Sequence, residues 1–206
     1  MEMSPSLLPS ITDTRRITQA LAMLDAILCP EWEDRYYSFS GGWGHDEEMA
    51  SMRDGSGDDW FLLLDSKGAA LKGFAHELAS DGSFPQNIQN QVPSDFMSFL
   101  GEPAFFMQHA TFCYWRRSND PSWSKVSGFL AEDGSEDMLA LLVSGPSGYK
   151  DWAEGYFEVP VALDAVSAVF AHQPLNDSII LQLNPEADLG FTYTQAAEIG
   201  YPCDAA

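Results

Sequence analysis

Apolar residues recur at helical spacing near the start of the chain. After Thr12 and Asp13, either of which suits a helix N-cap, apolar side chains fall at three- and four-residue intervals from Ile17 to Leu28, and Pro30 follows. This spacing places the apolar side chains on one side of a helix, and a proline cannot continue it. The pattern therefore predicts an amphipathic helix that ends before Pro30.

The next block changes to the two-residue period of β-strands. Short apolar or mixed segments alternate with clusters of glycine, aspartate and serine, the residues that tolerate the backbone angles of tight turns. The expected strands are 36–39, 48–53, 60–64 and 69–74, and the expected turns are 41–42, 54–59 and 66–68. Neighbouring strands joined by tight turns predict an antiparallel meander.

The second half mixes both periods. A polar loop over 80–90 precedes a short helix over 93–100 that ends at Gly101. Further strands are expected at 105–116, 138–143 and 178–183, and further helices at 149–157, 163–170 and 194–199. Since no internal repeat or long linker divides the chain, we expect a single domain over residues 1–206. Its class is α+β, an antiparallel or mixed β-sheet with helices packed on one face, and residues 1–11 form a loosely docked N-terminal segment.

The excess of acidic residues indicates which classes of partner the protein can bind. The chain has 31 acidic and 10 basic residues, a formal charge of −21, and no lysine or arginine follows Lys150. Such a surface repels phosphate backbones and anionic lipids, whereas it attracts a basic protein. We therefore expect no direct binding to nucleic acid or to a membrane. Charge that serves only to keep the protein in solution is the other explanation.

Cysteine usage bears on the compartment. Cys29, Cys113 and Cys203 are widely spaced and form no CxxC pair, which argues against a disulfide framework and a structural zinc site. No apolar run is long enough to span a bilayer. These features predict reduced thiols and a cytoplasmic protein without a cofactor or metal.

Three constellations suggest chemistry, and each also has a structural explanation. Asp54, Ser56, Asp58 and Asp65 fall at EF-hand positions 1, 3, 5 and 12, but Asp59 replaces the required glycine at position 6, which favours a solvated turn.

The other two constellations each contain a histidine. His76 beside Glu77 suits acid–base work, yet adjacent residues of a strand point to opposite faces. His109 and Cys113 suit a nucleophile and its base, yet their aromatic surroundings favour packed side chains. No catalytic motif is present, so whether the chain is an enzyme stays open, with a non-enzymatic role preferred.

Tryptophans beside acidic residues suggest a different kind of site. An aromatic ring rimmed by carboxylates is the composition of an anchor for a basic partner. Of the six tryptophans, Trp43 and Trp152 are expected to be exposed because their neighbours are polar. The predicted partner-binding residues are Trp43, Asp46, Glu47, Glu48, Asp54, Asp58, Asp59 and Trp152. Arg53 is expected to pair with Asp54 and fix the turn.

Residues 36–39, Trp43 and the segments 49–59 and 72–77 resemble a group of uncharacterised bacterial proteins that is loosely similar to immunity proteins of polymorphic toxin systems. Residues 93–100 also look like the short helix of the SUKH immunity superfamily. The resemblance implies an acidic cytoplasmic inhibitor that masks a basic toxin.

The leading hypothesis is therefore an acidic intracellular protein-binding protein, an immunity-type inhibitor of a basic toxin or other basic partner. The alternative is an enzyme or small-ligand-binding protein with a site near His76, Glu77 and the Asp54–Asp59 turn. A nucleic-acid mimic with regularly spaced carboxylates ranks third.

Overall fold

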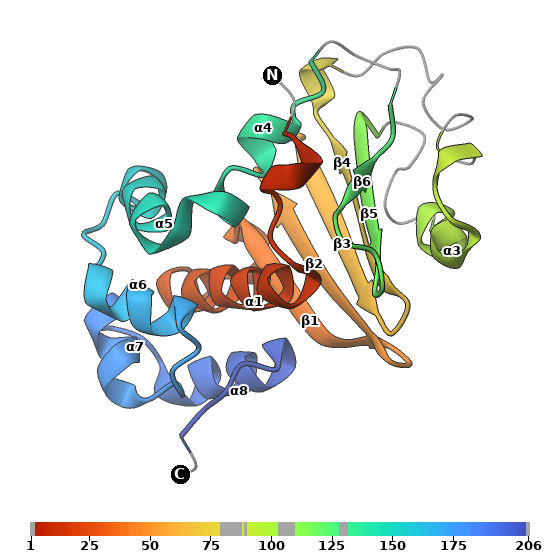
Figure 1. Cartoon of the computed structure of the whole chain (residues 1–206). Helices are drawn as coiled ribbons and strands as arrows, with labels where there is room; N and C mark the ends of the chain where they lie inside the picture. The colour runs from red at the N-terminus through yellow and green to blue at the C-terminus, as the bar shows by residue number, and fades with distance from the viewer. Residues whose placement is uncertain (1–2, 79–87, 89, 103–109, 128–131, 205–206) are drawn as a thin grey trace.

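The protein is an α+β structure in which one antiparallel sheet is packed against a group of helices (Figure 1). The computed structural model describes residues 3–78, 88, 90–102, 110–127 and 132–204. Among these residues, no helix is long and apolar enough to cross a membrane. The predicted loop at 80–90, the beginning of the strand expected at 105–116, and His109 lie mostly or wholly outside the described residues.

The sheet is a six-stranded meander in which every strand pairs with its neighbours in the sequence. All the pairings are antiparallel, so the predicted class is confirmed in its antiparallel form. The strands are β1 Tyr37–Gly44, β2 Glu47–Arg53, β3 Asp59–Asp65, β4 Gly68–Phe74, β5 Phe112–Arg117 and β6 Ser124–Lys125.

The first helix confirms the prediction from apolar spacing. Helix α1 spans Ile11–Leu28, and its cap is Ser10, whose hydroxyl accepts a hydrogen bond from the Asp13 amide. The cap therefore lies two residues before Thr12 and three before Asp13, the two expected positions. The helix ends at Leu28, and Pro30 follows, as the missing amide proton of proline requires.

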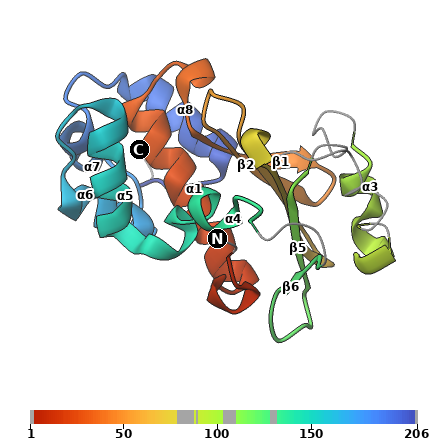
Figure 2. The same ribbon diagram turned by 90° about the horizontal axis from the view of Figure 1, so that it is seen from above.

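The longer helices pack together on one face of the sheet, which we call the core face (Figures 1 and 2). The hydrophobic core lies between the sheet and these helices, and its side chains come from positions throughout the chain, the first Met3 and the last Tyr201. The sheet contributes Trp60, Leu62 and Leu71, among others. The helices after the sheet are α4 Ser135–Met138, α5 Leu141–Phe157, α6 Leu163–Phe170, α7 Asp177–Leu183 and α8 Leu189–Ile199.

The opposite face of the sheet carries a smaller layer. The predicted short helix is present as a 3₁₀ turn, Ser94–Phe96, followed by α3, Met97–Leu100, with Gly101 at its end. Phe96 and Phe99 pack there against side chains from the middle of the sheet, including Cys113. We call this the α3 face, and in Figure 2 α3 lies across the sheet from α1.

Two segments expected to be strands are helical. Residues 138–143 lie at the end of α4 and the start of α5, and the strand expected at 178–183 is α7. Short apolar runs do not distinguish a buried strand from a buried helix. In α7 the Asn176 side chain caps the helix by accepting from the Ile179 amide, and Ile179, Ile180 and Leu183 are buried at helical spacing. The helices expected at 149–157, 163–170 and 194–199 are confirmed within α5, α6 and α8.

The turn expected at Gly41–Gly42 is also wrong. Strand β1 continues to Gly44, and the chain reverses at His45 and Asp46, where Asp46 adopts a φ of 59°. Gly41 instead allows α8 to approach the edge of the sheet, because a Cβ there would lie 3.2 Å from the carbonyl oxygen of Ile199. The outer edge of β1 is thus covered by the end of α8.

The described part of the N-terminal segment contacts the body of the protein. Met3 is buried, its amide donates to the Ser135 hydroxyl at 2.9 Å, and its carbonyl accepts from the Tyr114 hydroxyl at 2.6 Å. Leu8 is also buried in the core.

Candidate functional site

The structure divides the predicted partner-binding residues between the two ends of β2. Trp43, Asp46, Glu47 and Glu48 belong to the β1–β2 hairpin, whereas Asp54, Asp58 and Asp59 surround the β2–β3 turn. Seven residues of strand span roughly 20 Å at about 3.3 Å each. The single acidic face expected between Asp46 and Asp59 is therefore two separate clusters.

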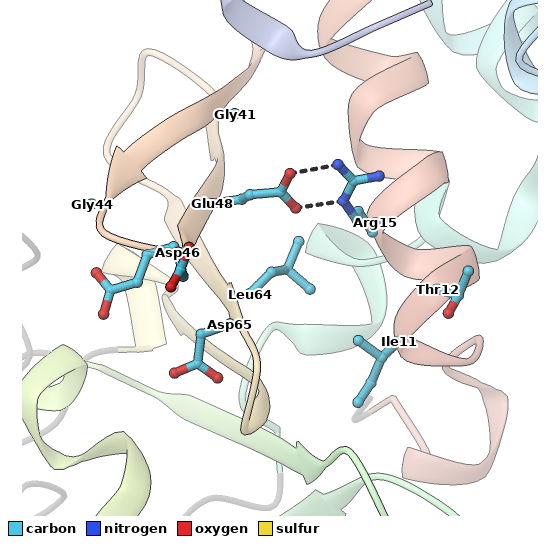
Figure 3. Close-up of a pocket in the computed structure, with 10 residues that line it drawn as sticks. Ile11, Thr12, Arg15, Gly41, Gly44, Asp46, Glu48, Leu64 and Asp65 are labelled. Atoms are coloured by element: carbon cyan, nitrogen blue, oxygen red, sulfur yellow. Dashed lines mark hydrogen bonds and ion pairs between the residues drawn. The ribbon is translucent and has the colours of Figure 1, made fainter.

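The acidic residues of the β1–β2 hairpin line a cavity of about 550 Å³ beside the start of α1 (Figure 3). Arg15 in α1 forms a bidentate ion pair with Glu48, which joins the helix to the hairpin. Asp46, Glu47 and Asp65 contribute further carboxylates to the same lining. Acids dominate the charge of this lining, and Arg15, the one arginine among its described residues, is already paired with Glu48.

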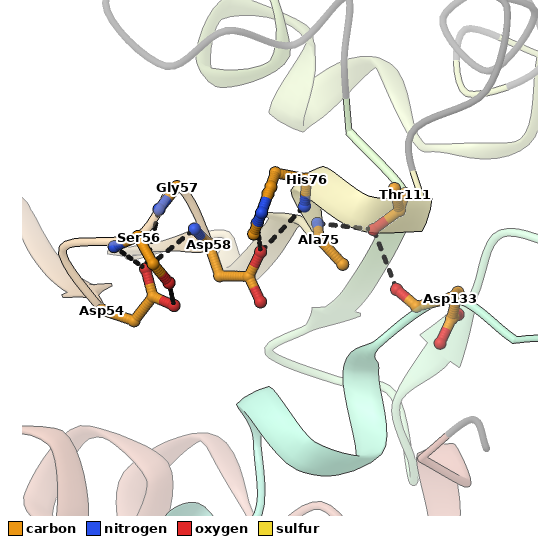
Figure 4. Close-up of polar contacts among 8 residues, drawn as sticks. All are labelled: Asp54, Ser56, Gly57, Asp58, Ala75, His76, Thr111 and Asp133. Carbon is orange, nitrogen blue, oxygen red and sulfur yellow. Dashed lines mark hydrogen bonds and ion pairs between the residues drawn. The ribbon is translucent and has the colours of Figure 1, made fainter.

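At the opposite end, the carboxylate of Asp54 organises the β2–β3 turn (Figure 4). One of its oxygens accepts the backbone amides of Ser56, Gly57 and Asp58 at 2.8 to 2.9 Å. The pKa of Asp54 is lowered, because these bonds and the Ser56 hydroxyl outweigh the effect of its partial burial. The EF-hand pattern is therefore explained by a self-capped turn. Across the described chain, no three acidic, histidine or cysteine side chains are placed to hold a metal ion.

His76 lies beside the same turn and is paired with Asp58. Its Nδ1 is 2.7 Å from Asp58 Oδ1, and the same oxygen accepts the His76 backbone amide at 2.8 Å. The side-chain hydrogen bond to Asp58 is the main cause of the raised pKa of His76. The neighbouring Ala75 amide donates to the Thr111 hydroxyl, and that hydroxyl donates to the Asp133 carbonyl (Figure 4). These bonds fix the backbone that carries His76.

The other residues considered for catalysis are not gathered around His76. Glu77 is exposed and follows it in a 3₁₀ turn, His76–Leu78, rather than in a strand. Neither His76 nor Asp58 lines the cavity beside the start of α1. Cys113 is fully buried, and burial raises the pKa of its thiol to about 12, which keeps it protonated at neutral pH.

Trp152 is partly buried, although we expected it to be exposed. It stacks on Tyr156 at 5.1 Å between ring centres and meets the edge of Tyr36 at 4.9 Å. These contacts make it part of the packing between α5 and β1. Arg53 also differs from expectation, since its guanidinium lies over the ring of Trp32 at 4.3 Å while Asp54 bonds its own turn.

A groove of about 770 Å³ lies on the α3 face beside the part that α3 covers. The two-residue period explains its floor, because cross-strand partners point to the same side: Ser38 pairs with Ser51, Ser40 with Met49, and Ser51 with Phe61. The lining residues are Trp32, Ser38, Phe39, Ser40, Gly41, Gly42, Trp43, Met49, Ser51, Arg53, Phe61, Ala197, Glu198 and Gly200.

The groove is hollow because its floor side chains are small. The floor includes Ser38, Ser40 and Gly42, which are every second residue along β1. A Cβ added at Gly42 would meet no atom of the described chain within 4 Å. Trp32 and Trp43 stand at its two ends and remain 53% and 49% exposed. This combination provides two large aromatic surfaces about a concave floor.

Exposed acidic residues lie near both tryptophans of this groove in the sequence, and one acid lies in its lining. Glu31, Glu33 and Asp34 flank Trp32 in sequence and are exposed, Glu198 lies in the lining, and Asp46 is exposed beyond Trp43. Arg53 is the only cation among the described lining residues, and it already lies over Trp32. The groove therefore combines large aromatic side chains with nearby acidic residues.

Sequence reasoning found Trp43 but missed the rest of this groove. Because strand residues two positions apart share a face, the sequence places Ser38 and Ser40 on one face, and Met49, Ser51 and Arg53 on one face. It does not indicate which face stays uncovered. Trp32 has acidic neighbours on both sides, and that signal was available without the structure.

The chain matches no protein-family model, and no similar curated protein or solved structure was found.

Proposed function

We propose that this chain is a protein-binding protein that captures a basic partner in the groove between Trp32 and Trp43. The observation that carries the proposal is a groove with small floor residues between two half-exposed tryptophans, with Glu198 in its lining and further exposed acids near each tryptophan in the sequence. Tryptophan side chains in desolvated pockets dominate the energy of many protein interfaces. The nearby acids supply attraction to a cationic partner.

The net charge acts at longer range than these contacts. A chain of formal charge −21 attracts a basic protein from a distance and orients its approach, which raises the association rate at low salt. A stable complex buries about 800 Å² on each partner, an area larger than the groove alone provides. The hairpin acids Asp46 and Glu47 lie next to Trp43 in the sequence and extend the contact surface at that end.

An immunity-type inhibitor of a basic toxin is the form of this function that the sequence resemblance favours. A cytoplasmic location belongs to the same proposal. The inhibitor would act by covering a basic surface of the toxin, and no catalytic step is required of this chain.

The test is affinity capture with four matched baits from the native lysate. The wild-type chain, Trp32→Ala combined with Trp43→Ala, Gly42→Phe, and Tyr156→Ala are compared at low and high salt. Gly42 lines the groove and a Cβ there meets no described atom within 4 Å, so Gly42→Phe adds a ring at the groove without disturbing the core. Tyr156 is an exposed aromatic residue outside the groove lining. We expect a stoichiometric basic protein on the wild-type and Tyr156→Ala baits, released by salt and lost from the two groove variants. Equal recovery on all four baits would refute the groove as the binding surface.

His76 supports a second candidate, an acid–base function near the Asp54–Asp59 turn. Its Nδ1 is oriented by Asp58, the arrangement in which a histidine presents its other nitrogen to a substrate. A ligand screen by NMR that monitors the His76 ring tests this candidate. Binding that shifts the His76 signals and is lost in His76→Gln supports it, and unchanged signals across the screen count against it.

A further inference from the structure

We propose that Trp32 is a docking site for an arginine side chain of the partner, and that Arg53 of the chain itself fills this site until the partner displaces it. The inference rests on the proposed function, since it specifies which side chain the groove recognises. It assigns Arg53 the role of an internal competitor.

The contact between Arg53 and Trp32 shows that the site accepts a guanidinium group. The carbon at the centre of the guanidinium lies 4.3 Å from the centre of the Trp32 ring, well within the range of cation–π attraction. Arginine is better suited to this stacking than lysine, because its guanidinium is planar and weakly hydrated. A guanidinium on a partner has the same shape and charge as the one already present.

Trp32 is held in place by the segment that carries it. It begins the 3₁₀ turn Trp32–Asp34, and the guanidinium of the buried Arg35 donates to the carbonyls of Cys29 and Pro30 at 2.8 Å. At the far side, the Asp25 carboxylate accepts the amides of Tyr36 and Tyr37 at 3.1 and 2.7 Å. The backbone that carries the ring is therefore preorganised, and a ligand need not order the loop on binding.

Arg53 has an acidic residue beside it, to which its side chain can turn when it leaves Trp32. Its cross-strand partner is Asp59, whose pKa is raised chiefly by burial, and the charge of Arg53 offsets part of that rise. Arg53 is only partly buried at the end of β2, so its side chain can turn without disturbing the core. Exchange replaces one stacked guanidinium by another and moves Arg53 toward a carboxylate.

A double-mutant cycle tests the exchange with hexa-arginine and hexa-lysine peptides as probes. Dissociation constants at low salt are measured by calorimetry for the wild type, Arg53→Gln, Trp32→Leu and the double variant. Lys67→Gln removes an exposed positive charge outside the groove lining and controls for net charge. We expect Arg53→Gln to tighten hexa-arginine binding about two- to fivefold more than Lys67→Gln does, the range for an exposed cation–π contact. This gain should vanish in the Trp32→Leu background and be smaller for hexa-lysine.

Equal gains from Arg53→Gln and Lys67→Gln, or an unchanged gain without Trp32, would overturn the inference. Gly42→Phe distinguishes this failure from failure of the proposed function. If Gly42→Phe abolishes peptide binding while the cycle is additive, the groove binds cations but Arg53 does not compete for Trp32. If Gly42→Phe leaves peptide binding unchanged, the groove is not the binding surface and both proposals fail.

Discussion

The hydroxyl of Tyr149 in α5 donates a 2.8 Å hydrogen bond to the fully buried carboxylate of Asp25 in α1. The other oxygen of Asp25 accepts the amides of Tyr36 and Tyr37 at the beginning of β1. One carboxylate thus joins two helices to the edge strand of the sheet and helps to hold the segment that carries Trp32.

Asp25→Asn is expected to remove part of the pH dependence of stability. Burial is the largest cause that raises the pKa of Asp25 from 3.8 to about 7. Because the folded state binds this proton more tightly than the unfolded state, the contribution of Asp25 to stability is full below about pH 4 and is lost as the pH rises to about 7. Urea unfolding measures the free energy of unfolding of both proteins. Relative to the wild type, that of the variant should rise by a few kcal/mol over this pH range, at about 1.4 kcal/mol for each pH unit. Parallel stability curves would contradict this assignment.

Tyr149→Phe should destabilise the protein. The change removes one hydrogen-bond donor from a buried carboxylate, which costs about 1–3 kcal/mol. Tyr156→Phe is the matched control, since Tyr156 is exposed and its loss of a hydroxyl should change the free energy of unfolding by less than about 0.5 kcal/mol. Chemical denaturation at neutral pH measures both, and equal effects would argue against the Asp25 contact.

Gly73→Ala should destabilise the sheet, whereas Gly42→Ala should not. A Cβ at Gly73 would lie 2.0 Å from an atom of the Phe112 ring, while one at Gly42 would meet no described atom within 4 Å. Overpacking of this kind costs about 1–3 kcal/mol or more. An alanine at an open strand position is neutral or stabilising by about 0.4–1 kcal/mol, because it restricts the unfolded chain. Thermal unfolding of the two variants compares these glycines directly.

Asp58→Asn should lower the pKa of His76 toward its ordinary value of 6.5. The side-chain hydrogen bond to Asp58 is the leading cause of the raised pKa, and Glu77 contributes a smaller charge effect. Glu77→Gln is therefore the control and should produce a smaller decrease. NMR titration of the ring protons gives both values, and an unchanged pKa in Asp58→Asn would show that the 2.7 Å contact is not maintained in solution.

Elements with a strong local pattern could be predicted from the sequence. Helix α1 follows from apolar residues at helical intervals, and β2, β3 and β4 follow from a two-residue period between turn residues. Residues 178–183 suggest a strand from the sequence because a run of isoleucine and leucine is compatible with both structures. Only the helical spacing of the buried residues and the Asn176 cap, seen in place, decide for a helix.

The candidate site depends more on tertiary structure than the fold class does. The sequence by itself determined the acidic surface, the absence of a recognised catalytic motif and the faces on which strand residues lie. Tertiary packing placed Asp46 and Asp58 at opposite ends of β2 and buried Trp152 in part. Among the described residues, it also left a groove between Trp32 and Trp43 on the α3 face, beside the part against which α3 packs. Alternation along a strand assigns side chains to faces, but which face remains open depends on elements that are distant in the sequence.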